Sequence, residues 1–158
     1  MQQLKFLSIF GADAASDSEL LSLVADKLYE EGYVKQTYKS ALLEREKKYP
    51  TGIKAEKLGV SIPHTDCVHV NCNAIVTVTT KNPIRFNEMG GEKTDFVDVE
   101  CLFFILLCEG GNQIKMLMNF MKIIQNTKDL EAVKASNSDA EVAAILGSYL
   151  NGGCGANE

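Results

Sequence analysis

Residues Val97–Cys108 read VDVECLFFILLC, and this stretch decides the fold class. Its first half alternates apolar and acidic residues, a pattern typical of a strand with one exposed face. From Cys101 to Cys108 the stretch is continuously apolar, as expected of a central strand that is covered on both faces. A membrane span needs roughly 18 apolar residues, so this run of eight is too short to cross a bilayer. It predicts the buried strand of a layered sheet.

Helical and extended patterns alternate on both sides of this strand. Residues 74–80 are rich in β-branched side chains and are predicted to form a second strand, while 4–10 fits an edge strand. Two serine–glutamate pairs, each three residues apart, are capping boxes that predict helix starts at Ser16 and Ser138. Periodicity and turn residues predict the other elements: a first helix ending at Gly32, helices over 37–48, from 112 onwards and over 128–135, and a short extended piece over 60–63.

Two finer details of this pattern concern a turn and a helix face. Asn82-Pro83 is predicted to turn the chain after the strand over 74–80. The helix that opens at 110–112 is expected to bury a stripe at helical spacing, formed by Ile114, Leu117, Met118, Met121 and Ile124. Helices before, between and after strands indicate one α/β domain over 1–151. The Gly-rich, polar residues 152–158 are expected to form a flexible tail.

The composition excludes several classes of protein. The chain has 158 residues, of which 46% are hydrophobic and 23% charged, and this excludes a disordered chain or a fibre. The formal net charge of -5 argues against general nucleic-acid binding, since phosphate contacts need clustered cations. The N-terminus lacks the basic start and apolar core of a signal peptide, so a cytoplasmic location is expected. The five cysteines, an odd number without a CxxC pair, are then expected to be free thiols.

Both histidines of the chain, His64 and His69, lie in one short segment. Pro63 keeps the residue before it out of the helical region, so His64 leaves the end of a strand on a backbone with little freedom. Such a histidine can present one ring nitrogen to a ligand while a hydrogen bond holds the other. The alternative is a loop histidine without a function.

Two other chemistries remain open for the segment His64–Cys72. The side chains of His64, Cys67, His69 and Cys72 are all possible zinc ligands, but their spacing matches none of the common zinc motifs. Cys67 or Cys72 paired with a histidine could form a nucleophile, although no local signature supports it. The chain has no Walker loop, so phosphate from a nucleotide is not an expected substrate, and it has no GxSxG nucleophile motif. By charge alone, Arg45-Glu46 fits a solvated helix face and Thr51-Gly52 a turn.

Three short motifs in order carry a family resemblance: Arg45-Glu46, then Tyr49-Pro50-Thr51-Gly52, then Gly59-Val60-Ser61-Ile62-Pro63-His64. Together they resemble the enzyme IIA domains of the fructose-mannitol class, which belong to the bacterial phosphoenolpyruvate-dependent sugar phosphotransferase system. The resemblance implies a three-layer α/β/α domain with a mixed sheet flanked by helices. It also implies that His64 takes a phosphoryl group from the phosphocarrier protein HPr and passes it to a cysteine of a cognate enzyme IIB. No metal or other cofactor is implied.

The same resemblance assigns the surroundings of the histidine. Arg45 matches the family's arginine near the phosphorylated residue, and Thr51 or Thr65 could add a hydroxyl donor. Gln113 stands where mannitol and fructose members carry a second histidine, and this departure resembles the galactitol-specific enzyme IIA. His69 matches no catalytic position. The family suggests that Nε2 of His64 carries the phosphate while Nδ1 bonds a backbone carbonyl.

The resemblance leaves alternatives for the biological role. Nitrogen-type members of the family use the same histidine in a regulatory relay, and such domains also occur within larger transcriptional regulators. Met1 lies only a few residues before the first predicted element, so a complete, separate chain is expected. In the transport role the protein would associate with a IIB–IIC transporter without inserting into the membrane.

Overall fold

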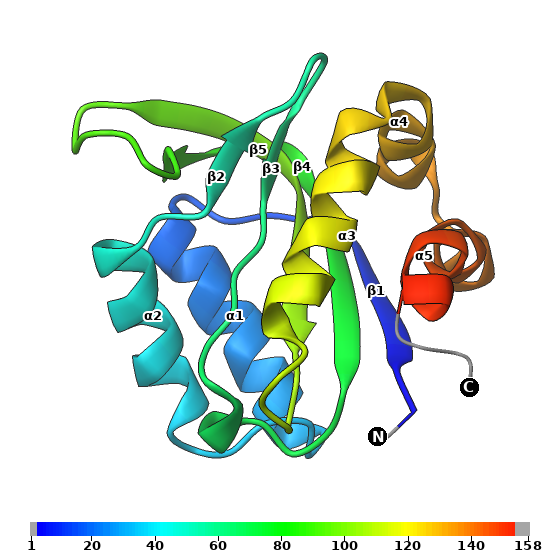
Figure 1. Ribbon diagram of the computed structural model, residues 1–158. Helices are drawn as coiled ribbons and strands as arrows, with labels where there is room; N and C mark the ends of the chain where they lie inside the picture. The colour runs from blue at the N-terminus through cyan, green and yellow to red at the C-terminus, as the bar shows by residue number, and fades with distance from the viewer. Residues whose placement is uncertain (1–2, 154–158) are drawn as a thin grey trace.

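One mixed sheet forms the middle layer of the fold (Figure 1). The computed structural model describes residues 3–153. Its strand order is β1-β4-β5-β3-β2, in which β1–β4 and β3–β5 are parallel pairs and β4–β5 and β2–β3 are antiparallel pairs. The edge position predicted for the first strand is therefore confirmed. The bounds are β1 (Lys5–Ala12), β2 (Gly52–Lys54), β3 (Gly59–Ser61), β4 (Ala74–Asn87) and β5 (Phe96–Leu106).

Helices cover both faces of this sheet. One core cluster joins α1 and α2 to the sheet, and a second joins α3, α4 and α5 to its opposite face. Both predicted helix starts are confirmed, since the Ser16 and Ser138 hydroxyls each accept a bond from the backbone N–H three residues later, which is the serine half of a capping box. The predicted three-layer α/β/α fold is confirmed. The helices are α1 (Asp17–Glu30), α2 (Tyr38–Lys48), α3 (Gln113–Gln125), α4 (Thr127–Ala135) and α5 (Asp139–Gly153), with a 3-10 turn η1 (Cys67–His69).

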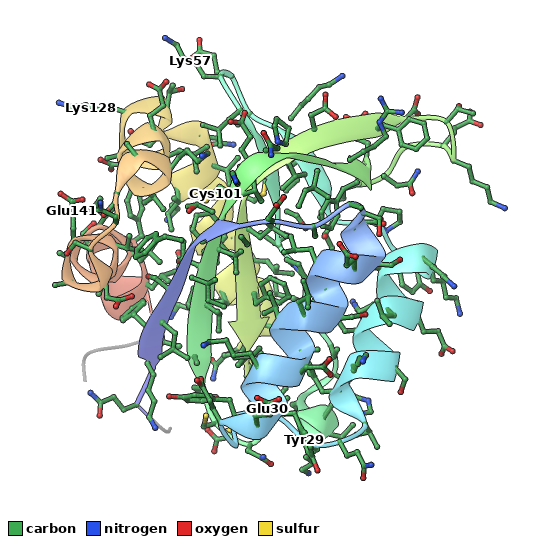
Figure 2. The ribbon with its side chains drawn as sticks, turned by 180° about the vertical axis from the view of Figure 1, so that it is seen from behind. Tyr29, Glu30, Lys57, Cys101, Lys128 and Glu141 are labelled. Carbon is green, nitrogen blue, oxygen red and sulfur yellow. The ribbon has the colours of Figure 1, made fainter. Side chains whose placement is uncertain are left out.

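The central strand β5 contributes side chains to both cores, as its sequence predicts. Leu102 and Phe104 point into the core under α1 and α2, whereas Phe103 and Ile105 point into the core under α3 to α5. Cys101 belongs to the second core and lies inside the molecule in Figure 2. Successive strand residues face opposite sides of a sheet, so only a continuous apolar run can fill two cores at once.

The turn predicted at Asn82-Pro83 is wrong. Strand β4 continues through this dipeptide to Asn87, and its pairing with β5 shifts register between Thr79 and Ile84. A bulge of this kind absorbs extra residues while the strand goes on. Because the residues of a bulge lie outside the regular ladder, the N–H that Pro83 lacks is not missed. The hairpin of β4 and β5 therefore extends beyond the helices, as Figure 1 shows.

The buried face predicted for α3 is also wrong in part. Ile114 is 76% exposed and Met118 is 61% exposed, although both were expected in the core. The helix instead buries a stripe one position over, centred on Met116 and Phe120, and the Phe120 ring lies 5.1 Å from that of Phe103. Apolar residues surround this helix, so two faces satisfy the helical spacing and the sequence does not choose between them. Ile114 and Met118 therefore lie on the exposed face of α3.

Strand β3 carries the chain toward a point between α2 and α3 (Figure 1). Gly59 at its start packs so closely on β5 that a Cβ there would lie 2.1 Å from the carbonyl oxygen of Asp98. At its far end, the Pro63 carbonyl accepts a bond of 3.0 Å from the N–H of Ile105. The segment before His64 is thus fixed on the sheet at both ends.

Two further findings concern the C-terminal end of the domain and the absence of a membrane-spanning helix among residues 3–153. Helix α5 runs to Gly153, and the remainder of the tail predicted over 152–158 lies outside the described residues. Within residues 3–153, none of the helices combines the length and the apolar character that crossing a membrane requires.

Candidate active site

His64 sits where the backbone leaves β3, and its ring is held by its own segment. The Nδ1 atom lies 2.7 Å from the carbonyl oxygen of Ile62. A carbonyl oxygen only accepts, so Nδ1 carries the hydrogen and donates it. The other ring nitrogen, Nε2, then holds a free lone pair. The half-buried imidazole is therefore oriented and in a single tautomer.

The surroundings of His64 favour the neutral imidazole. Burial is the main cause that lowers its pKa below the ordinary value, and the nearby positive charge of Arg45 lowers it further. The hydrogen bond to Ile62 and the charge of Asp66 raise this pKa, but together they do not outweigh the two effects that lower it. A neutral imidazole with a free Nε2 is a nucleophile, whereas imidazolium has no lone pair to offer.

Arg45 lies on α2 beside a hollow of about 220 Å³. Its Nη1 atom is 3.7 Å from Oδ1 of Asp66, and its guanidinium stacks 5.6 Å from the centre of the Tyr49 ring. The Nε atom is buried and finds no hydrogen-bond acceptor among residues 3–153. This guanidinium thus has unused donor capacity next to the histidine. The hollow is lined by Ala41, Glu44, Arg45, Lys48, Tyr49, Thr65, Asp66 and His69.

A smaller cavity joins His64 to the start of α3. Gln113, the first residue of that helix, lines it, as the sequence analysis predicts for the site. Thr65 lines both this cavity and the larger hollow, so it connects the histidine to Arg45. Its hydroxyl donates to the Asp66 carbonyl oxygen at 3.0 Å. The cavity is lined by His64, Thr65, Ile105, Leu107, Gln113 and Leu117.

The N-terminus of α3 lies at this cavity, because its first residue, Gln113, lines it. Asn112 precedes the helix, and its side chain makes no capping bond. The first N–H groups of a helix have no partner within the helix and carry the positive end of its dipole. Together with the Arg45 guanidinium, this end of α3 makes the surroundings of His64 suited to a negatively charged group.

Thr51 does not belong to the site, and its predicted role as a phosphate donor is not matched. It is only 3% exposed and lines neither the hollow nor the cavity. Its hydroxyl lies 2.8 Å from Oε1 of Glu46 and 2.8 Å from the hydroxyl of Ser61. Its N–H donates to Oε2 of the same glutamate at 2.8 Å. The side chain is therefore fully occupied inside the protein, behind the site.

Glu46 is the residue near the site that charge patterning misses. Its place among Arg45, Lys47 and Lys48 indicates a solvated helix face, yet it is only 8% exposed. Burial raises its pKa to about 7, against the hydrogen bonds from Thr51 that lower it. The sequence contains one sign that Glu46 is unusual. The C-terminal end of a helix favours cations, so an acidic residue there suggests a specific contact.

His69, Cys67 and Cys72 form no metal-binding group with His64. His69 turns its Nδ1 to the hydroxyl of Thr37 at 2.8 Å and lies on the rim of the larger hollow. Cys67 and Cys72 are free and partly exposed. Among residues 3–153, no group of three or more His, Cys, Asp or Glu side chains is arranged to hold a metal ion. The metal hypothesis for the segment His64–Cys72 thus has no support from the described part of the chain.

Sequence comparisons agree with this geometry. The family model described as "Phosphoenolpyruvate-dependent sugar phosphotransferase system, EIIA 2" matches residues 5–149. The galactitol-specific EIIA component of Escherichia coli K12 is 27% identical over 107 residues, which are 68% of this chain and 70% of that protein. The transcriptional regulator ManR of Bacillus subtilis is 33% identical over 92 residues, which are 58% of this chain and 13% of ManR.

A solved structure has the same fold. The complex of mannitol enzyme IIA with phosphorylated enzyme IIB from Escherichia coli matches with a TM-score of 0.71 and 22% identity, covering 89% of this chain and 94% of that one. At this identity the likeness concerns the fold, and the family model supplies the assignment. Since that model covers nearly the whole chain, the protein belongs to the EIIA 2 family of the phosphoenolpyruvate-dependent sugar phosphotransferase system and is a phosphotransferase component of the fructose-mannitol class.

Proposed function

We propose that Nε2 of His64 accepts a phosphoryl group from phospho-HPr and passes it to a cysteine of a cognate enzyme IIB. The observation that carries this proposal is the hydrogen bond from Nδ1 of His64 to the Ile62 carbonyl. It leaves Nε2 as the only ring nitrogen able to form a new bond. The choice of a phosphoryl group is supported by the Gln113 amide and the Thr65 hydroxyl in the cavity with His64 and by the nearby charge of Arg45.

Each transfer exchanges one bond to phosphorus for another. The Nε2 lone pair of His64 attacks the phosphorus of the donor phosphohistidine, and the donor P–N bond breaks as the new one forms. In the second step a cysteine thiolate attacks the same phosphorus, and the electrons of the P–N bond return to Nε2. The loose transition state needs positioning and charge stabilisation, with no redox partner or cofactor.

Arg45, Gln113 and Thr65 serve this transition state in different ways. The Arg45 guanidinium neutralises charge on the outer phosphoryl oxygens and can bind two of them. Gln113 donates a side-chain N–H from the first turn of α3, where the backbone N–H groups also face an anion. Thr65 offers a hydroxyl if it releases the carbonyl of Asp66.

Partner docking fits the exposed face of α3. Ile114 and Met118 are exposed apolar side chains on the helix whose first residue, Gln113, lines the cavity with His64. A phosphoryl donor or acceptor protein must cover this region to bring its own residue to Nε2. Apolar surface removed from water at that contact would favour the encounter.

We infer that the sugar served by this protein is galactitol or a related hexitol. Support comes from the galactitol-specific relative in Escherichia coli and from Gln113 in place of a second histidine. Because enzyme IIA passes phosphate between proteins, the sugar is determined by the cognate enzymes IIB and IIC. The protein would act in the cytoplasm beside that transporter.

A regulatory phosphohistidine relay is the second candidate, and the match to ManR is the observation that favours it. The chemistry at His64 would be the same. The two roles differ in the acceptor, because a transport component delivers phosphate to a IIB cysteine at a useful rate. Incubating the phosphorylated protein with candidate IIB proteins separates them.

The proposed function is tested by intact-protein mass after incubation with phosphoenolpyruvate, enzyme I and HPr. We expect the wild type to gain one acid-labile phosphoryl group and His64→Ala to gain none while keeping its fold by circular dichroism. His69→Ala, which removes the other histidine, is expected to keep the label. Full labelling of His64→Ala would overturn the assignment.

A further inference from the structure

Two neighbouring residues near the end of α2 face opposite environments. Arg45 lines the hollow beside the site, while Glu46 turns into the interior toward β3. Successive residues of a helix point about 100° apart, so one short stretch of backbone can carry both. Because the two residues share the rigid backbone of α2, contacts that fix the position of Glu46 also fix the position of Arg45.

Glu46 is held by a matched set of hydrogen bonds. Its two carboxylate oxygens accept the N–H and the hydroxyl of Thr51, both at 2.8 Å. The Thr51 hydroxyl gives its hydrogen to Glu46, so at its 2.8 Å contact with Ser61 it accepts the serine hydrogen. All three side chains are buried, and each donor in this chain meets one acceptor. We call this set the Glu46–Thr51–Ser61 chain.

This chain of hydrogen bonds ends at Ser61, three residues before His64. Ser61 is fully buried in β3 and paired with Gly52 on one side and Leu102 on the other. The next residue, Ile62, supplies the carbonyl that orients the His64 ring. The same buried chain thus connects the helix that bears the cation to the strand that bears the nucleophile.

We propose that Glu46 is a positioning residue: through Thr51 and Ser61 it fixes the end of α2 against β3, and so holds the Arg45 guanidinium at its working distance from His64. The kinetic part of this inference rests on the proposed function. It also explains why the Arg-Glu and Pro-Thr-Gly motifs stand together in the sequence, since one supplies the acceptor and the other the two donors.

Glutamine cannot keep the hydrogen bonds of ionised Glu46 as they are. A carboxylate offers two acceptor oxygens to the two donors of Thr51, whereas an amide offers one oxygen and one NH₂ group. In Glu46→Gln the NH₂ can meet the Thr51 oxygen only if the Thr51 and Ser61 hydroxyls both reverse, which leaves the buried Ser61 hydrogen without its Thr51 acceptor. The change preserves size and shape, and therefore tests the hydrogen bonds with little disturbance of packing. Rates are compared above pH 7, where Glu46 is ionised.

The first test is a double-mutant cycle on the rate of phosphoryl uptake from phospho-HPr, measured by rapid quench. Misplacement of a catalytic group by about 1 Å can cost on the order of 100-fold, so we expect Glu46→Gln to slow uptake by roughly 10-fold or more. In the Arg45→Ala background the same change should add less than about a 3-fold loss, because the group being positioned is gone. Equal losses in both backgrounds would overturn the inference.

Matched variants separate positioning from general destabilisation. Thr51→Val removes the hydroxyl and should slow uptake as Glu46→Gln does, whereas Thr51→Ser keeps the hydroxyl and should restore most of the rate. Glu131→Gln removes one exposed carboxylate on α4, in the opposite layer, and serves as the charge control. A loss of thermal stability in Glu46→Gln at full uptake rate would assign it a purely structural role.

The second test needs no partner protein. Arg45 lowers the pKa of His64, so a displaced guanidinium should raise that pKa. His64 titrates in a range where Glu46, with a pKa of about 7, is largely protonated and resembles glutamine, so the variant for this test is Thr51→Val, which breaks the hydrogen-bond chain without changing a charge. We expect an NMR titration of the His64 ring in Thr51→Val to move upward, and not to move upward in the Arg45→Ala background. A downward or absent shift would contradict the inference. If the wild type takes up no phosphate, the proposed function fails while this titration still decides the positioning role.

Discussion

The Nδ1 atom of His64 donates to the carbonyl oxygen of Ile62, two residues earlier, over 2.7 Å. This bond lies within one short segment, and Pro63 between the two residues restricts its backbone. The ring orientation is therefore a local property of Ile62-Pro63-His64. What the rest of the fold adds is the polarity around the free Nε2, and the predictions below separate these contributions.

The pH dependence of phosphoryl uptake should report the pKa of His64. Only the neutral ring attacks, and burial together with Arg45 lowers that pKa. We expect the uptake rate to be level at neutral pH and to fall on the acid side, with an apparent pKa below the ordinary 6.5 or so. In Arg45→Ala the acid limb should move to higher pH. A wild-type acid limb above the ordinary value would contradict the stated environment.

Arg45→Lys and Arg45→Ala should differ in the uptake rate. Removing a donor that stabilises transition-state charge costs on the order of 100-fold, which we expect for Arg45→Ala. Lysine restores the charge but not the planar pair of donors, so Arg45→Lys should recover only part of the rate. Single-turnover kinetics with phospho-HPr measures both. Identical rates for the wild type and Arg45→Ala would exclude the guanidinium from the transition state.

Changes at Gln113 should follow the order set by hydrogen bonding. Gln113→Ala loses a donor to the negatively charged phosphoryl oxygens, and we expect uptake to slow by roughly 10- to 100-fold, as for the loss of one hydrogen bond to a charged group. Gln113→Glu has the same shape but places an anion in the cavity with His64, and should be slower still. The rate order wild type, alanine, glutamate checks this, and a faster glutamate variant would refute it.

Stability should depend on pH through Glu46. Its pKa is raised by burial from 4.5 to about 7, so the folded protein holds a proton that the unfolded chain releases between these values. The stabilisation is fully present below pH 4.5 and is lost as pH rises through 7. At about 1.4 kcal/mol per pKa unit, the change is roughly 3 kcal/mol.

Urea unfolding at several pH values, compared between the wild type and Glu46→Gln, isolates this contribution to the free energy of unfolding. The lowered pKa of His64 gives a slope of the opposite sign, but it is present in both proteins and largely cancels in the difference. We expect the wild type to lose stability relative to Glu46→Gln as pH rises. A constant difference across the range would mean that Glu46 does not titrate there.

A methyl group at Gly59 should disrupt the junction of β3 and β5. Its Cβ would lie 2.1 Å from the backbone oxygen of Asp98 and 2.7 Å from Cγ1 of Val97. The shortest contact is with the backbone of β5, which cannot rotate away as a side chain can, so Gly59→Ala should lower the free energy of unfolding by roughly 3 kcal/mol or more. Gly110→Ala, whose Cβ would meet nothing within 4 Å, is the control and should cost under about 1 kcal/mol. Equal unfolding midpoints would refute the close approach.

The sequence predicts the scaffold of the site better than its polar details. His64, Thr65 and Gln113 line one cavity and Arg45 lies beside it, as the resemblance implies. Thr51 was expected among them because a threonine hydroxyl suits phosphate. Which way a hydroxyl points depends on packing between α2, β2 and β3, and no local pattern encodes that.

The errors in the fold have a similar origin. Asn82-Pro83 has the composition of a turn, yet long-range pairing of β4 with β5 carries the strand through it. On α3, the stripe with Ile114 and the stripe with Met116 are both mainly apolar, and packing against the sheet, α4 and α5 selects the second. In each case local propensity allows two structures, and tertiary contacts determine which of them forms. Where one pattern dominates, as in β5, prediction and structure agree.

The two cores on opposite faces of the sheet have a consequence for folding intermediates. Arg45 comes from the layer of α1 and α2, and Gln113 comes from the layer of α3. His64 follows the end of strand β3, in the sheet between these layers. A half-folded chain, with one helical layer docked and the other detached, would hold an incomplete constellation around the ring. Under the proposed function, such a species should take up phosphate more slowly than the native protein. The rate of uptake during refolding would then report the docking of both helical layers.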